Sequence, residues 1–189
     1  MRKIIIGVLG LALVGGLGLG LASAADTSQP AAGAAPAAGA AGDCCKPGDT
    51  TPPLDLIKAT PIGGLHSPYN DQVDALAEEG HKKYLSYSCN GCHGGGGGGG
   101  MCPPLTNDSW VYGASDDTLF RLISLGSDEL QKQGYKRIKQ EIVVGPMPPF
   151  GGIIKTSDEL WKVIAFLRAK NPSSLKRAGE ATQPLSGAK

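Results

Sequence analysis

The sequence is poor in aromatic residues and has no excess of either charge. Aromatic side chains make up 5% of the 189 residues, and 18 Lys and Arg face 17 Asp and Glu. Without a basic excess the chain has little with which to neutralise a phosphate backbone, so a nucleic-acid partner is not expected. Few bulky aromatic groups also mean that side chains alone supply a thin core.

Other missing patterns narrow the chemistry further. No segment alternates apolar and polar residues over the length of a strand, which excludes a sheet-based fold. No second C-x-x-C and no H-x-x-x-H motif exists to complete a zinc site. The glycine run at residues 94–100 lacks the Lys-Ser/Thr that follows a phosphate-binding loop. The abundant residues are 29 Gly and 14 Pro, which favour long loops.

The N-terminus has the pattern of an export signal. Arg2 and Lys3 precede the apolar stretch Ile4 to Leu21, and Ala22-Ser23-Ala24 has the small-x-small form of a cleavage site. A retained membrane anchor is the alternative, although several glycines weaken such a helix. We therefore expect residues 1–24 to be a signal peptide, the mature protein to be periplasmic, and no stable membrane insertion after signal removal.

The remaining chain divides into a tether, a domain and a tail. Residues 25–53 are rich in Ala, Gly and Pro and show no hydrophobic periodicity, which predicts a flexible tether. Residues 176–189 are polar and are expected to fray. The folded part is then a single domain over residues 54–175, about 120 residues long.

Three helices are predicted inside this domain. Apolar residues recur three and four apart over residues 69–86, 115–125 and 157–170. The expected N-caps are Ser67 or Asn70 for the first, Ser115 for the second, and Thr156 with Glu159 as a capping box for the third. Gly126 is expected to end the second helix. The sequence thus predicts an all-α fold with long Gly- and Pro-rich loops.

Residues 89–93 read Cys-Asn-Gly-Cys-His, a C-x-x-C-H motif. At this spacing Cys89 and Cys92 can reach the two vinyl groups of one haem, while the imidazole of His93 reaches the iron. A redox dithiol, half a zinc site and a plain disulfide are the alternatives. A redox dithiol is usually carried by an α/β framework that is not found here, so covalent haem c with His93 as proximal ligand is preferred.

The sixth iron ligand must come from elsewhere in the chain, and four residues are candidates: Met101, Met147, His66 and His81. Met101 follows His93 by only eight residues and would have difficulty crossing the haem plane. Met147 lies among three prolines that stiffen its backbone, so it is the preferred distal ligand. A neutral thioether favours ferrous iron and leaves no open coordination position, which points to electron transfer.

With these residues in view, the region from Tyr69 to Asn171 resembles a class I c-type cytochrome. Gly80 and Tyr84 match the small-plus-aromatic pair of that family's first helix, and residues 164–168 match the aliphatic-aromatic run of its last helix. The resemblance implies three or more helices packed around one covalently bound haem, with the first and last helices crossing. It also implies an electron carrier rather than an enzyme.

A narrower resemblance follows from the stretch after the motif. The glycine-rich loop followed by P-x-L-x-N-D-x-W-x-Y, residues 103–112, is similar to cytochromes that serve quinoprotein alcohol dehydrogenases, in particular the four-cysteine, methanol-metabolism-related group. In such relatives, residues placed like Trp110 and Tyr112 lie near the haem propionates. The resemblance implies a quinoprotein alcohol dehydrogenase as electron donor and a cytochrome or terminal oxidase as acceptor.

Three cysteines lie outside the haem motif: Cys44, Cys45 and Cys102. In an oxidising compartment one disulfide from Cys102 to Cys45 or Cys44 would staple the end of the tether over the glycine-rich loop. Two further functions stay open. The iron could serve a haem enzyme or small-ligand sensor with a displaceable sixth ligand, or the chain could be a binding module without haem.

Overall fold

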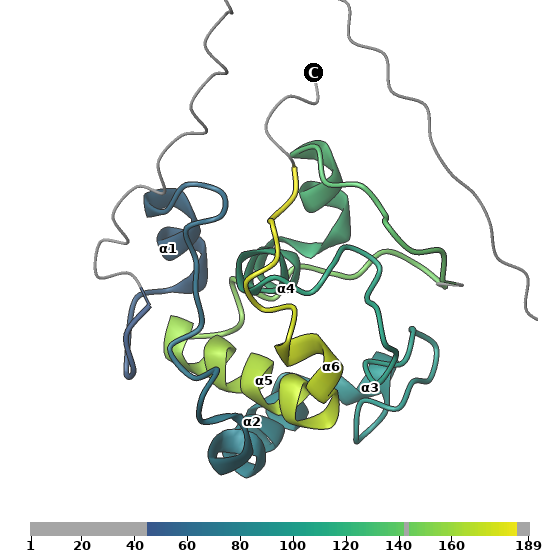
Figure 1. Cartoon of the computed structure of the whole chain (residues 1–189), viewed down its shortest axis with the longest axis horizontal. Helices are drawn as coiled ribbons and strands as arrows, with labels where there is room; N and C mark the ends of the chain where they lie inside the picture. Colours follow the sequence, from purple (N-terminus) through teal and green to yellow (C-terminus); the bar gives the residue numbers. More distant parts are fainter. Residues whose placement is uncertain (1–44, 142–143, 185–189) are drawn as a thin grey trace, which may run out of the picture. The chain divides into compact units, whose positions relative to one another are not determined.

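The computed structural model describes residues 45–141 and 144–184 of the chain. These residues form helices and loops, with no strand in either range, so the predicted all-α fold is confirmed. The helices, coloured along the chain in Figure 1, are α1 Pro53–Ala59, α2 Val73–Ser86, α3 Asn90–His93, α4 Asp116–Lys132, α5 Ser157–Lys170 and α6 Pro172–Leu175.

Helix α5 has the bounds that its sequence predicts. The side chain of Thr156 caps it by accepting a hydrogen bond from the Glu159 N–H at 3.2 Å. The capping box is only half formed, because the Glu159 carboxylate accepts instead from Lys83 Nζ at 2.6 Å and from Tyr87 Oη at 2.5 Å. A residue expected to act within one helix therefore ties α5 to α2.

Helix α2 begins at Val73, four residues later than predicted. The two expected caps bind elsewhere, since the Asn70 amide donates to the Asp116 carboxylate at 2.7 Å and the Ser67 hydroxyl accepts from the Tyr69 N–H at 3.2 Å. Asp116 is buried and also receives the guanidinium of Arg168. Because a buried carboxylate needs donors, it draws Asn70 into a loop.

Helices α2 and α5 cross at Gly80, as the resemblance implied. A Cβ atom at Gly80 would lie 2.1 Å from the carbonyl oxygen of Lys162 and 2.9 Å from Cβ of Phe166, so only glycine permits this approach. Tyr84 and Phe166 pack beside the crossing with ring centroids 5.1 Å apart. This crossing joins the helix that leads into C-x-x-C-H to the helix that lines the pocket described below.

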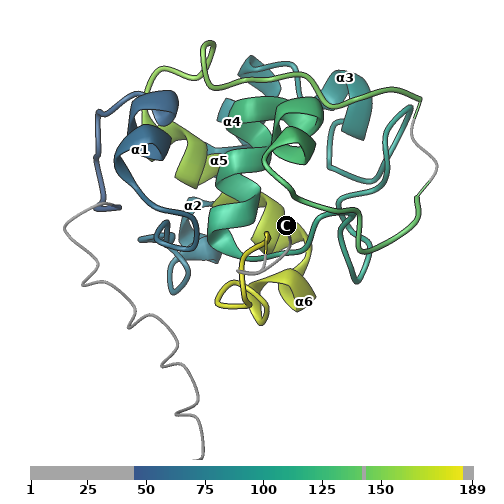
Figure 2. The same cartoon turned by 90° about the horizontal axis from the view of Figure 1, so that it is seen from above.

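Helix α4 begins at its predicted cap, where Ser115 accepts from the Thr118 N–H at 3.3 Å. Gly126 interrupts it, with φ 75° and ψ 168°, but a further helical turn follows to Lys132. The predicted stop is therefore a break within α4. In both views α1 and α3 lie on opposite sides of α4 (Figures 1 and 2).

The ends of the described chain are more ordered than the sequence suggests. Residues 49 and 51, placed in the predicted tether, accept backbone hydrogen bonds from Asp158 and Ser157 at the start of α5. In the predicted tail, the Ala178 carbonyl accepts from the Asp116 N–H at 2.9 Å. The predicted signal peptide, residues 1–24, and the first part of the tether lie outside the described residues.

Candidate functional site

The C-x-x-C-H segment starts where α2 ends in a Schellman turn. The Cys89 N–H donates to the Tyr84 carbonyl and the Ser88 N–H to the Leu85 carbonyl, while Ser88 adopts a left-handed φ of 60°. Glycine usually takes this position, so serine here costs conformational energy. The turn directs the chain from α2 into the short helix α3, which ends at His93.

His93 is oriented by a backbone carbonyl. Its Nδ1 lies 3.0 Å from the Pro103 oxygen, which can only accept, so Nδ1 carries the proton and Nε2 keeps a free lone pair. Burial lowers the pKa of His93, and the hydrogen bond to Pro103 opposes that shift only in part. The imidazole is thus held neutral, the form in which histidine binds a metal ion.

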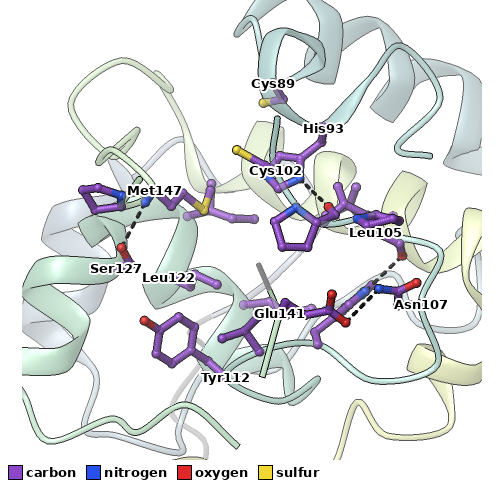
Figure 3. A pocket seen from close by; sticks show the side chains of 18 of the residues that line it. Cys89, His93, Cys102, Leu105, Asn107, Tyr112, Leu122, Ser127, Glu141 and Met147 are labelled. Carbon is purple, nitrogen blue, oxygen red and sulfur yellow. Dashed lines mark hydrogen bonds between the residues drawn. The ribbon is translucent and has the colours of Figure 1, made fainter. Parts of the chain in front are cut away.

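A largely apolar pocket of about 430 Å³ opens beside His93. This volume lies within the range typical of cofactor sites, about 300–1,000 Å³. Figure 3 shows His93, Cys89 and Cys102 at one end of it and Tyr112 at the other. The apolar walls come from α4 and α5: Leu119, Leu122, Ile123, Val163 and Leu167.

Of the four candidate sixth ligands, Met147 is the one that lines this pocket. In Figure 3 its side chain extends toward the side on which His93 lies. Met101 is 60% exposed, and His66 is also exposed. His81 stacks on Phe166 and donates through Nε2 to the Gly95 carbonyl at 2.6 Å, so it holds the glycine loop.

These observations fit a covalently held haem. Cys89 lines an apolar pocket beside a neutral, oriented imidazole, and a thioether enters the same pocket from a distant loop. Burial raises the pKa of the Cys89 thiol to about 11, so this thiol lies in its neutral form against the apolar pocket. Within the described part of the chain, no three His, Cys, Asp or Glu side chains gather as ligands for a bare metal ion.

Trp110 and Tyr112, the predicted propionate contacts, both line the pocket but differ in what they can donate. The Trp110 indole N–H already donates to the Leu105 carbonyl at 3.0 Å. The Tyr112 hydroxyl accepts from the Gln131 amide at 2.7 Å, which leaves its own hydrogen available. Tyr112 therefore remains a candidate donor, whereas Trp110 contributes an apolar wall.

The polar residues that accompany Tyr112 in the pocket were not predicted from the sequence. Gln131, Arg137 and Glu141 also line the pocket, and the Asn107 amide donates to the Glu141 carboxylate at 3.0 Å. They lie in the last turn of α4 and in the loop after it, and no motif in the sequence marks them. Only the chain path beyond Gly126 brings them to this end of the pocket.

The glycine run folds back on the haem motif itself. Tyr84 Oη donates to the Gly94 carbonyl at 2.7 Å, and the Cys102 N–H donates to the Cys92 carbonyl at 3.1 Å. A Cβ at Gly94 would lie 2.5 Å from the Gly99 oxygen, and one at Gly100 would lie 2.8 Å from the Cys92 oxygen. Glycine is required here because the backbone crosses itself closely.

The predicted disulfide between Cys102 and Cys45 is not formed in the structure. Among the described residues Cys102 has no disulfide partner; its thiol interacts with Cys92, and burial together with this contact raises its pKa to about 11. Cys45 instead packs against the core, in the segment that precedes α1. The other partner, Cys44, lies outside the described residues, so that pairing stays a prediction.

Comparison with known proteins supports the same interpretation. Residues 75–167 match the family model described as cytochrome C oxidase, cbb3-type, subunit III. This range contains the C-x-x-C-H motif and Met147, and it runs from α2 into α5. The chain therefore contains a cytochrome c domain of all-α fold, which binds haem c covalently and fits an electron carrier. No curated protein and no solved structure matches the chain.

No helix among residues 45–141 and 144–184 combines the length and the apolar character that crossing a membrane requires.

Proposed function

We propose that this cytochrome c domain is a periplasmic mono-haem carrier that accepts single electrons from a quinoprotein alcohol dehydrogenase. It passes them to a downstream cytochrome or terminal oxidase. The observation that carries the proposal is the pocket, into which a neutral His93 and the thioether of Met147 both extend. With haem bound, such a pair would supply the two iron ligands that the porphyrin does not, and would leave no open coordination position for a substrate.

Four residues would hold the cofactor. Cys89 and Cys92 would form the two thioether bonds, His93 would be the proximal iron ligand and Met147 the distal one. Bound haem c supplies a one-electron Fe(III)/Fe(II) couple. The protein orients His93 through Pro103, excludes water with the apolar walls of α4 and α5, and offers a soft ligand that stabilises the ferrous state.

The polar end of the pocket would receive the two propionates. Tyr112 can donate its hydroxyl hydrogen, Gln131 fixes the orientation of that hydroxyl, and the exposed Arg137 supplies a positive charge. Arg137 is itself held by the Glu141 carbonyl, to which it donates at 2.7 Å. This arrangement supports one orientation of the macrocycle, with its charged edge at the end away from Cys89.

The proposed electron donor and the proposed periplasmic location are inferred from the sequence. The stretch from Gly94 to Gly113 resembles cytochromes that serve quinoprotein alcohol dehydrogenases, and residues 1–24 have the form of an export signal. Mixing the reduced methanol or ethanol dehydrogenase with the ferric holoprotein in a stopped-flow instrument tests the donor. Saturable reduction of the haem is expected, and no reduction by any of these enzymes would reject it.

The absorption spectrum of the ferric holoprotein tests the carrier function separately. A low-spin spectrum with a near-red sulfur-to-iron charge-transfer band is expected, and Met147→Ala should abolish that band. Met101→Ala is the matched control, because its exposed thioether lies outside the pocket lining. A high-spin ferric spectrum of the wild type would instead favour an enzyme or a sensor with a displaceable ligand.

A further inference from the structure

The loop that carries Met147 is bound to the break in α4. In an unbroken helix the Ser127 N–H would donate to the Ile123 carbonyl, but here it donates to the Met147 carbonyl at 2.9 Å. The Ile123 carbonyl accepts instead from the Phe150 N–H, and the Ser124 carbonyl accepts from the Gly151 N–H, both at 2.9 Å. The loop thus takes over hydrogen bonds that the helix gives up.

Ser127 also binds Met147 in the other direction. Its side-chain hydroxyl accepts a hydrogen bond from the Met147 N–H at 3.0 Å, drawn as a dashed line in Figure 3. Both polar groups of the Met147 backbone are therefore held by one residue. Ser127 is only 6% exposed, so water competes poorly for these bonds.

The loop around Met147 has few backbone N–H donors, because it is rich in proline. Residues 146, 148 and 149 are prolines and have no N–H to donate. Over residues 146–151 the only N–H groups belong to Met147, Phe150 and Gly151, and each of them donates to α4. Ser127 is the one side chain among the three acceptors, whereas the other two are backbone carbonyls that substitution leaves in place.

Gly126 lets the loop approach this closely. A Cβ atom there would lie 2.7 Å from the Met147 oxygen and 2.9 Å from the Pro149 nitrogen, and the φ of Gly126 is 75°. The missing side chain at Gly126 thus allows both the break in α4 and the close position of the Met147 loop.

We propose that Ser127 is a positioning residue for the sixth iron ligand: its hydroxyl and N–H fix the Met147 backbone and so direct the thioether toward the haem. The inference rests on the proposed function, because it takes Met147 as that ligand. Ser127 contacts neither the iron nor the electron partner in this role, and it acts through the loop alone.

The test uses purified holoprotein with Ser127 replaced by Ala, Thr or Val. Thr keeps a hydroxyl on Cβ, whereas Val has the same shape without it. The readouts are the near-red charge-transfer band, the midpoint potential and the affinity of the ferric protein for added imidazole, which must displace Met147. Loss of one hydrogen bond should raise the imidazole affinity about five- to tenfold in Ser127→Ala and Ser127→Val. Ser127→Thr should restore values near those of the wild type.

Ser124 provides the matched control. It lies one turn earlier in α4, and its buried hydroxyl has no hydrogen-bond partner among the described residues, so Ser124→Ala should leave all three readouts unchanged. If Ser127→Val behaves like Ser127→Thr, the positioning role is wrong even though the carrier function stands. If the wild type itself lacks the charge-transfer band, the assignment of Met147 fails first, and the proposed function fails with it.

Discussion

A single methyl group added at Gly80 tests the packing on which the haem pocket depends. In an exposed helix, Gly→Ala stabilises by about 1 kcal/mol because alanine has the better helix propensity. At Gly80 the new Cβ would lie 2.1 Å from the Lys162 carbonyl oxygen, which belongs to the backbone of α5 and cannot rotate away. We therefore expect the opposite sign, a loss of stability.

The size of the effect follows from the geometry. Relief of the contact to an ordinary 3.4 Å requires α2 and α5 to separate locally by about 1.3 Å. Overpacking of this kind costs about 1–3 kcal/mol, and the separation also admits solvent to the seam beside Tyr84 and Phe166, which are each 1% exposed. After the propensity gain of about 1 kcal/mol, Gly80→Ala should lower the free energy of unfolding by up to about 2 kcal/mol.

Guanidinium unfolding of the holoprotein, followed by far-UV circular dichroism, measures this loss. Gly179→Ala is the control, because nothing lies within 4 Å of a Cβ at that position. The pocket should also be disturbed, since Val163 and Leu167 of α5 line it and Cys89 follows α2. A Gly80→Ala protein as stable as Gly179→Ala, or more stable, would refute the close crossing of α2 and α5.

Three further predictions concern the surroundings of the site. Burial raises the pKa values of Asp158 and Glu159, but hydrogen bonds outweigh it and lower both below their ordinary values of 3.8 and 4.5. A carboxyl group whose pKa is lower in the folded state than in the unfolded state stabilises the fold while it is ionised. The stabilisation by Asp158 and Glu159 should therefore be complete above about pH 5 and decline as the pH falls further. Acid-unfolding curves measure this decline, which should be smaller in Glu159→Gln. Ser88→Gly should raise the free energy of unfolding by about 1 kcal/mol, since it relieves a left-handed φ, and a decrease in urea stability would contradict the Schellman turn. Cys102→Ser should attach haem by two thioether bonds as the wild type does, whereas Cys92→Ser should retain a single thioether bond; the α band of the reduced pyridine haemochrome, which lies at longer wavelength when one vinyl group is unreacted, distinguishes the two.

Features with local causes could be predicted from the sequence. The bounds of α5 follow from Thr156 at its start and Asn171-Pro172 at its end, residues that act on their immediate neighbours. The haem motif is likewise local, because two thioether bonds and one iron ligand must come from adjacent positions on a single turn. Met147 could be singled out for a similar reason, since the prolines around it mark a stiff loop.

Features that depend on distant partners could not be predicted. Asn70 is a good helix cap in isolation, but its side-chain amide donates a hydrogen bond to the carboxylate of Asp116, 46 residues away. The sequence does not show which group the Trp110 indole N–H binds, and in the structure it donates to the Leu105 carbonyl. Gly126 was expected to end a helix, and the Met147 loop instead supplies the bonds that let α4 continue.

The sequence by itself determined that the protein is helical, that it carries a haem motif, and that Met147 is a candidate ligand, because each depends on spacing along the chain. Only the tertiary structure decided how the Met147 backbone is held. The Ser127 hydroxyl and the Met147 N–H are 20 residues apart, and no periodicity relates them. They meet because a glycine without a Cβ lets the loop reach the break in α4, which is a property of the packed chain.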